Sequence, residues 1–194
     1  MVHRSPHPDI VVQNLWLYDM VFSAAQARGD APAMADGLTG RVITYGQLID
    51  RIRRTAAGLA SRGIGKGDVV SIWAPNLPEW PIAFFAAIRV GATVHTSNPV
   101  STPEEMSYQL SDAGSRLLIT VNALSEKARE AIAESGRSLE IVTLDDSPFP
   151  TLASLMIDAP LPAVDIDPAA VQACRDNAER NGVTFWFAII WRHR

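Results

Sequence analysis

The sequence predicts an α/β fold, a parallel-type sheet flanked by helices. Within residues 69–145, apolar β-branched segments alternate with amphipathic ones in the order strand-helix-strand-helix-strand-helix-strand. The connections between them are only a few residues long. This alternation requires parallel strands joined by right-handed crossovers, with helices covering both faces of the sheet. The length of 194 residues suits one domain or part of a larger one.

The residues before the alternating region predict an extended arm, two helices and a hairpin. The opening dozen residues read as extended, and an apolar stripe predicts a helix over 14–28, closed by Gly29. The stretch DGLTGRVIT at 36–44 predicts a hairpin-like entry. Thr44 is the expected N-cap of a helix that ends at Gly63. One face of that helix carries Leu48, Ile52, Ala56 and Leu59.

The alternating region divides into four strands and three helices. Short turns flank the third helix of this region. The second helix has Ser101 or Thr102 as its expected N-cap. The expected strands are 68–74, 92–97, 115–121 and 139–145, and the expected helices are 77–90, 101–114 and 123–136. Beyond Asp146, the proline-rich residues 147–168 predict a surface connection.

Composition excludes several classes of function. A net charge of −4 gives no electrostatic footprint for nucleic acid or an anionic membrane. Cys174 is the only cysteine, so no intrachain disulfide is possible, and a lone thiol is compatible with a reducing compartment. The N-terminus is no good signal peptide, and no apolar run approaches the roughly 20 residues of a spanning helix. We therefore expect a soluble, cytoplasmic protein.

No catalytic, cofactor-binding or metal-binding residue is predicted. In α/β sheets, ligands bind beyond the carboxyl ends of the strands, and none of the turns expected there is glycine-rich. The glycines of RGIGKGD at 62–68 lie between a helix and a strand, at the opposite edge, and predict a helix end followed by a turn.

Other polar residues have structural interpretations. His95 sits in a strand pattern near its carboxyl end, where a histidine could face a ligand, and a buried, hydrogen-bonded histidine is the favoured interpretation. Glu104-Glu105 predict a helix start and Asp145-Asp146 a strand exit. The arginines at 51, 53 and 54 predict a solvated helix face.

Several stretches resemble one enzyme family when taken in order. They are TYGQL, GIGKGDVV, PNLPEW, GATV, NPVSTPEE, DAGSRLLIT and the linker PLPAVDIDP, all within residues 5–168. Together they resemble the beginning of the adenylate-forming ligases, most closely acyl-CoA synthetases of the 4-coumarate–CoA ligase type. The resemblance implies that residues 1–168 are the N-terminal portion of an AMP-dependent synthetase/ligase domain and that 169–194 are a divergent tail.

The resemblance also implies a chemistry. Intact members use ATP, Mg²⁺ and coenzyme A, and they need a Gly/Ser/Thr-rich phosphate loop with a lysine and a second lysine from a C-terminal domain. The phosphate loop is due shortly after VDIDP at 164–168, and nothing of that kind follows in the sequence. We therefore expect a truncated acyl- or aryl-CoA ligase that is inactive alone and has no cofactor of its own.

The tail allows other interpretations. Residues 165–183 look like a segment of S-adenosylmethionine-dependent methyltransferases, with Asp165 or Asp167 as the ribose-binding acid, but no glycine-rich cofactor loop precedes them. The plainer interpretation is a capped helix over 168–182, followed by the aggregation-prone TFWFAIIW. We expect truncation, fusion or a frameshift near 168–174.

A function from a different class stays open at this point. The chain could be a non-catalytic interaction module that retains the α/β layer. An incomplete sheet leaves an edge strand uncovered, so self-association or a partner chain is expected there.

Overall fold

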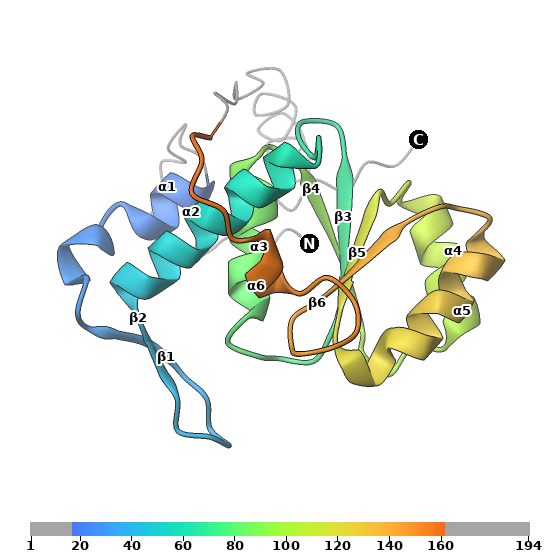
Figure 1. Ribbon diagram of the computed structural model, residues 1–194, viewed down its shortest axis with the longest axis horizontal. Helices are drawn as coiled ribbons and strands as arrows, with labels where there is room; N and C mark the ends of the chain where they lie inside the picture. Colours follow the sequence, from blue (N-terminus) through green and yellow to red (C-terminus); the bar gives the residue numbers. More distant parts are fainter. Residues whose placement is uncertain (1–16, 162–194) are drawn as a thin grey trace, which may run out of the picture. The chain divides into compact units, whose positions relative to one another are not determined.

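The computed structural model describes residues 17–161, whose centre is a four-stranded, fully parallel sheet (Figure 1). The strand order is β4-β3-β5-β6. The chain therefore adds β4 on one side of β3, crosses over β3, and adds β5 and β6 on its other side. The α/β fold class is confirmed. The strands are β3 Val69–Trp73, β4 Thr93–Ser97, β5 Leu117–Thr120 and β6 Glu140–Thr143.

Two helices cover each face of this sheet (Figure 1). Val70 and Ile72 of β3 belong to the hydrophobic cluster on the side of α2 and α3, whereas Trp73 belongs to the cluster on the side of α4 and α5. Because both faces of the sheet are covered, the two central strands, β3 and β5, are buried along nearly their whole length, whereas the edge strand β4 is not. The helices are α2 Tyr45–Ser61, α3 Trp80–Arg89, α4 Pro103–Asp112 and α5 Ser125–Ser135, with the short 3₁₀ turn η2 Asn122–Leu124 before α5.

Two helices begin with reciprocal capping boxes. The Thr44 hydroxyl accepts the Gln47 backbone N–H, and the Gln47 side chain accepts the Thr44 N–H. Thr102 and Glu105 make the same pair of bonds at the start of α4. Each box satisfies two backbone donors that the helix leaves without partners. The Thr44 cap is confirmed, and of the two expected caps for α4 the chain uses Thr102.

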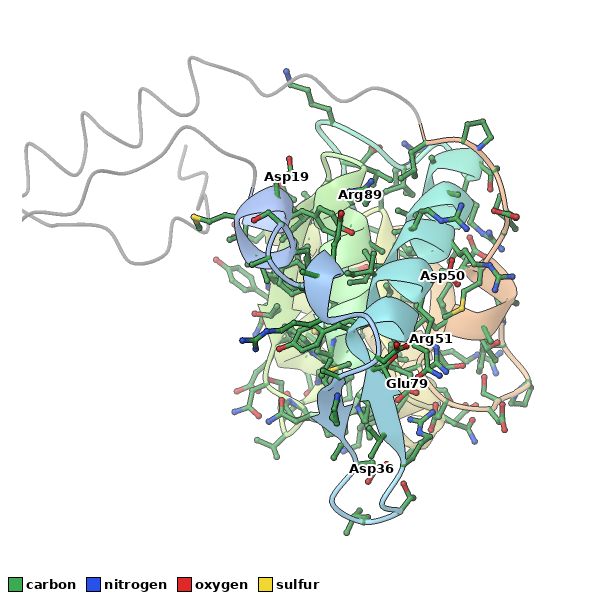
Figure 2. All side chains as sticks on the ribbon, turned by 90° about the vertical axis from the view of Figure 1, so that its left-hand side faces the viewer. Asp19, Asp36, Asp50, Arg51, Glu79 and Arg89 are labelled. Atoms are coloured by element: carbon green, nitrogen blue, oxygen red, sulfur yellow. The ribbon has the colours of Figure 1, made fainter. Side chains whose placement is uncertain are left out.

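The N-terminal elements differ in extent from the prediction. The hairpin is confirmed, with β1 Pro32–Ala35 antiparallel to β2 Val42–Thr44. The single helix over 14–28 is wrong for its described part, which divides into α1 Leu17–Phe22 and the 3₁₀ turn η1 Gln26–Arg28. Ala25, directly before the 3₁₀ turn, is still buried beside Phe22. The apolar residues of the predicted helix therefore face the core although the helix is not continuous. Arg89 of α3 lies 4.2 Å from the centre of the Tyr18 ring, which ties α1 to α3 (Figure 2).

The prediction of a mere surface connection after Asp146 is wrong. Residues Leu152–Leu155 form α6, whose two leucines are buried against α2. The backbone of the two helices meets at Gly58, where an added Cβ would lie 1.8 Å from the Leu155 carbonyl oxygen. Glycine is therefore required at this position of α2 because no side chain fits between the helices.

Several predictions fall outside the described residues. The boundary at residue 168, the tail helix over 168–182, TFWFAIIW, Cys174 and the aspartates at 165 and 167 all lie there. Within residues 17–161, no helix is long and apolar enough to cross a membrane.

We expect Gly58→Ala to lower the free energy of unfolding by about 1–3 kcal/mol, because the new methyl group would push α6 away from α2. In an exposed helix the same substitution is stabilising by roughly 1 kcal/mol, so the sign of the effect is diagnostic. Gly37→Ala is the matched control, since nothing lies within 4 Å of a Cβ at that position. Urea denaturation of the three proteins measures the difference; equal stability of Gly58→Ala and the parent would contradict the close contact.

Two fully buried threonines give a paired prediction. Thr55 makes no hydrogen bond through its hydroxyl within the described residues, whereas the Thr120 hydroxyl donates to the Trp73 carbonyl oxygen at 2.6 Å. Thr55→Val is therefore expected to raise the free energy of unfolding by about 1 kcal/mol, and Thr120→Val to lower it by about 1–3 kcal/mol. Denaturant midpoints measured side by side test the pair, and a loss of stability in both variants would contradict the assignment for Thr55.

Candidate functional site

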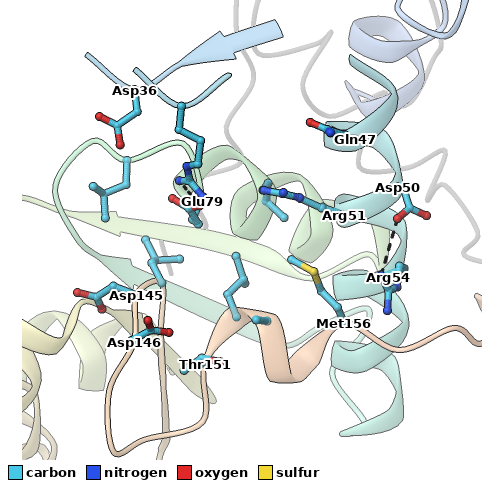
Figure 3. Close-up of a pocket in the computed structure, with 16 residues that line it drawn as sticks. Asp36, Gln47, Asp50, Arg51, Arg54, Glu79, Asp145, Asp146, Thr151 and Met156 are labelled. Atoms are coloured by element: carbon cyan, nitrogen blue, oxygen red, sulfur yellow. Dashed lines mark hydrogen bonds and ion pairs between the residues drawn. The ribbon is translucent and has the colours of Figure 1, made fainter. Parts of the chain in front are cut away.

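A cavity of about 700 Å³ opens at the carboxyl edge of the sheet (Figure 3). Its walls come from the β1–β2 hairpin, one face of α2, the loop after β3, the residues that follow β6, and α6. This is the edge at which open α/β sheets bind ligands. The lining residues are Asp36, Arg41, Gln47, Asp50, Arg51, Arg54, Leu77, Glu79, Ile82, Leu144, Asp145, Asp146, Thr151, Leu152, Ala153 and Met156.

The helix α2 supplies the basic wall of the cavity. Gln47, Arg51 and Arg54 follow one another at helical spacing, so they share the face that looks into it (Figure 3). In the side view, Arg51 and Asp50 lie on α2 and Asp36 on the hairpin below (Figure 2). The prediction of one solvated arginine face is correct in part: the side chains of Arg53 and Arg54 are 39% and 41% exposed, but Arg51 and Arg54 also line the cavity. The repeat RIRR could not predict this, because the walls formed by the loop after β3, the end of β6 and α6 come from distant parts of the chain.

One ion pair joins the hairpin to the start of α3. Arg41, just before β2, donates through Nη2 to Glu79 Oε1 at 2.5 Å, and Glu79 lies at the start of α3. The Glu79 side chain is only 17% exposed, so water screens this ion pair less than it screens a pair of fully exposed side chains. The contact fixes one rim of the cavity.

The acidic residues of the cavity are mostly satisfied by nearby donors. Asp36 accepts the backbone N–H groups of Leu38 and Thr39, which lower the pKa of its carboxyl. Asp145 follows the end of β6 at Thr143, as the predicted strand exit requires, and it accepts the N–H of Asn122 in η2 at 2.7 Å. Asp50 lies 4.0 Å from Arg54 on the same helix.

The glycine-rich turn lies away from this cavity, as predicted. Gly63, with φ of +71°, ends α2 in the left-handed conformation that glycine adopts readily. Arg116 donates to the Gly63 carbonyl and to the Asp68 carboxylate, and Asp68 also accepts the Gly65 N–H. The turn therefore holds the amino end of β3, and the Gly63 carbonyl and the Gly65 N–H take part in the hydrogen bonds that do so.

His95 does not reach the cavity. It pairs with Ser71 in the centre of the sheet, and its Nδ1 lies 2.9 Å from the Ser71 hydroxyl. The Ser71 hydroxyl lies 2.6 Å from that of Ser115, and both serines are fully buried. With a neutral imidazole, Ser115 donates to Ser71 and Ser71 donates to Nδ1, so both serine hydroxyls of this network have an acceptor. The favoured interpretation of a hydrogen-bonded histidine is correct, although His95 is only half-buried.

The paired acids are structural where they are described. Glu104-Glu105 form the first turn of α4, as predicted, and Asp145-Asp146 follow β6 at the rim of the cavity. Within residues 17–161, no group of three or more His, Cys, Asp or Glu side chains is placed to hold a metal ion.

Comparison with known proteins gives a consistent set of matches. A family model described as AMP-binding enzyme matches residues 21–181. The chain is 40% identical over 146 residues to 4-coumarate–CoA ligase 3 of Oryza sativa subsp. japonica, covering 75% of this chain and 26% of that protein. It is 35% identical over 181 residues to 4-coumarate–CoA ligase CCL1 of Humulus lupulus, covering 89% and 32%. The chain thus spans about a quarter to a third of the length of these relatives.

Solved structures show the same fold. The luciferase-like enzyme of the mealworm Zophobas morio superposes with a TM-score of 0.72 at 21% identity, covering 79% of this chain and 37% of that one. MbtA of Mycobacterium smegmatis superposes with a TM-score of 0.68 at 25% identity, covering 81% and 30%. The family match runs past residue 168, and the domain boundary expected there stays a prediction.

The His95 network predicts a pH dependence of stability. Burial lowers the pKa of the imidazole below its ordinary value of 6.5, and the Asp112 carboxylate offsets part of this effect. The unfolded chain therefore takes up a proton more readily than the folded one, so the stability contribution is complete above pH 6.5 and declines as the pH falls below it. We expect denaturant midpoints measured at about pH 7.5 and about pH 5.5 to differ more for the parent than for His95→Gln.

The other histidines, His3, His7 and His193, are present in both proteins, so the difference between the two isolates His95. Equal acid sensitivity of parent and variant would contradict this role.

Proposed function

Because the chain belongs to the AMP-binding enzyme family, we propose that it is the N-terminal α/β portion of an acyl- or aryl-CoA ligase of the 4-coumarate–CoA ligase type. The observation that carries this proposal is the match to 4-coumarate–CoA ligases over as much as 89% of the chain. The fold supports it, since the structural matches share the parallel sheet and its helices.

The reaction proposed for the intact enzyme has two steps. The carboxylate of the acid attacks the α-phosphate of ATP, which forms an acyl-adenylate and releases pyrophosphate. The thiol of coenzyme A then attacks the acyl carbon and displaces AMP, which gives the thioester. Both steps move negative charge at phosphate or carbonyl oxygens, so they require positioned donors and cations.

This chain contributes the framework on which those groups would be placed. The strand order reverses at β3, which has β4 on one side and β5 on the other, and this reversal marks the ligand-binding edge of α/β sheets. Two hydrogen bonds hold the carboxyl ends together there. The Trp73 indole donates to the Asn98 carbonyl after β4 at 2.9 Å, and the Thr120 hydroxyl of β5 donates to the Trp73 carbonyl.

The groups that would act on phosphate are not found in the sequence itself. Lys66 and Lys127 are its lysines, and neither belongs to a Gly/Ser/Thr-rich loop that follows a strand. Lys66 lies in the turn at the amino end of β3, and Lys127 is exposed on α5. Among residues 17–161, no three or more His, Cys, Asp or Glu side chains are grouped so that they could hold a metal ion. We therefore assign no catalytic residue to this chain and propose that its 194 residues do not complete adenylation alone.

A non-catalytic interaction module is the second candidate function, and one observation favours it. β4 is an edge strand of the described sheet, and it carries no proline, no bulge and no acidic or strongly basic side chain. Because Thr93 bonds inward to Asp68, the backbone groups of Val94 and Thr96 point away from β3. Such an edge can pair with a strand of another molecule.

Two proteins test the ligase proposal. We expect the 194-residue chain with ATP, Mg²⁺ and a panel of carboxylic acids to show no acid-dependent pyrophosphate release. A chimera in which residues 17–161 replace the matching segment of the rice ligase is expected to release pyrophosphate, because the sheet would present the same strand ends. Measuring pyrophosphate release by both proteins tests the two expectations.

The outcomes separate the two claims. Release by the isolated chain would overturn its proposed inactivity, whereas a folded but inactive chimera would overturn the ligase proposal. A defined oligomer of the isolated chain in light scattering, together with an inactive chimera, would favour the interaction module.

A further inference from the structure

We propose that the cavity at the carboxyl edge of the sheet binds a small organic anion, a carboxylate or a phosphate ester, and that Arg51 is its anion-binding residue. The proposal does not rest on the ligase function, because the cavity and its charged groups belong to this chain alone.

The first support is the pairing of charges around the cavity. Arg41 is paired with Glu79, Asp36 accepts two backbone N–H groups, and Asp145 accepts one. Asp50 is shared by Arg53 and Arg54. Among the charged lining residues, Arg51 and Asp146 are the two for which the described part of the chain provides neither an ion pair nor a hydrogen bond to the charged group.

These two residues differ in their exposure. Asp146 is exposed at the rim, so water satisfies its carboxylate. Arg51 is half-buried on α2, and its guanidinium points toward the interior of the cavity (Figure 3). Arg41 and Arg54 already have carboxylate partners, so Arg51 is the cation of the cavity for which a bound anion would supply a partner missing among the described residues.

The neighbours of Arg51 add donors on the same wall. Gln47 lies one turn earlier on α2; its Oε1 is used in the helix cap, which leaves its amide N–H groups for a ligand. Arg54 lies nearly one turn later, and its buried Nε has no hydrogen-bond partner within residues 17–161. A guanidinium presents a planar fork of donors that matches two oxygens of a carboxylate or phosphate.

The rest of the cavity suits the organic part of such a ligand. Its volume of about 700 Å³ is typical of small-molecule sites. Apolar side chains from the loop after β3, from α3, from the end of β6 and from α6 line it: Leu77, Ile82, Leu144, Leu152 and Met156. An anionic group with an apolar body therefore matches the cavity better than an inorganic ion.

Thermal unfolding of the 194-residue protein tests the proposal. The probes are inorganic phosphate, acetate and phenyl phosphate, with ionic strength held constant by sodium chloride, and the rise in Tm with concentration gives the affinity. We expect saturable stabilisation, with a Kd on the order of 1 mM for the small ions and tighter binding of phenyl phosphate because of the apolar lining. The phosphate and acetate arms show which anion the guanidinium prefers.

Three variants locate the binding group. Arg51→Gln is expected to weaken binding about tenfold, and Arg51→Lys to weaken it less, because the charge remains while the fork is lost. Asp146→Asn is expected to strengthen binding, since it removes the negative charge that competes with the ligand. Arg129→Gln is the control of equal charge change, because Arg129 is exposed on α5 beside Glu126 and outside the cavity.

Circular dichroism shows that each variant is folded before it is titrated. If Arg51→Gln and Arg129→Gln respond alike, or if Tm follows ionic strength alone, the assignment of Arg51 is overturned.

Discussion

Parallel pairing on both sides of β3 is the constraint on which the rest of the described structure depends. Its residues pair with β4 along one edge and with β5 along the other, and Val70 to Trp73 are fully buried. A strand in this position must be covered on both faces, which requires apolar helix faces from the crossovers on each side. Because the strand order reverses at β3, the same strand also brings three carboxyl ends together. Trp73 holds them there through its indole and its carbonyl group.

The features that could be predicted from sequence are those set by local periodicity and local hydrogen bonds. The alternation over 69–145 gives the parallel sheet because each segment shows its own period and each connection is too short for another topology. Thr44 could be recognised as a cap and the cap of α4 could be narrowed to Ser101 or Thr102, because these signals are local; the capping partners Gln47 and Glu105 lie three residues after Thr44 and Thr102. The glycine-rich turn at 62–68 could be excluded as a phosphate loop because it precedes a strand.

The cavity and α6 could not be predicted, since both arise from segments far apart in the sequence. The signal for α6 is a cap at Thr151 and two leucines three residues apart, which is too short to show a helical period. The half-burial of Arg51 depends on the hairpin directly before α2 and also on the end of β6 and α6, which lie far from Arg51 in the chain. His95 was correctly placed on a strand, but its bond to Ser71 depends on the register between β3 and β4.

The backbone contact between Gly58 and Leu155 has a kinetic consequence. It joins a helix that precedes the sheet to one that follows it, so the loop that it closes contains all four strands. Closing so long a loop before the strands have assembled gains no native contacts to offset the lost chain entropy, and α6 is therefore expected to dock late in folding. A contact absent from the transition state acts on the rate of unfolding rather than on the rate of folding. The fit between these two helices is thus expected to affect the rate of unfolding and therefore the lifetime of the native state.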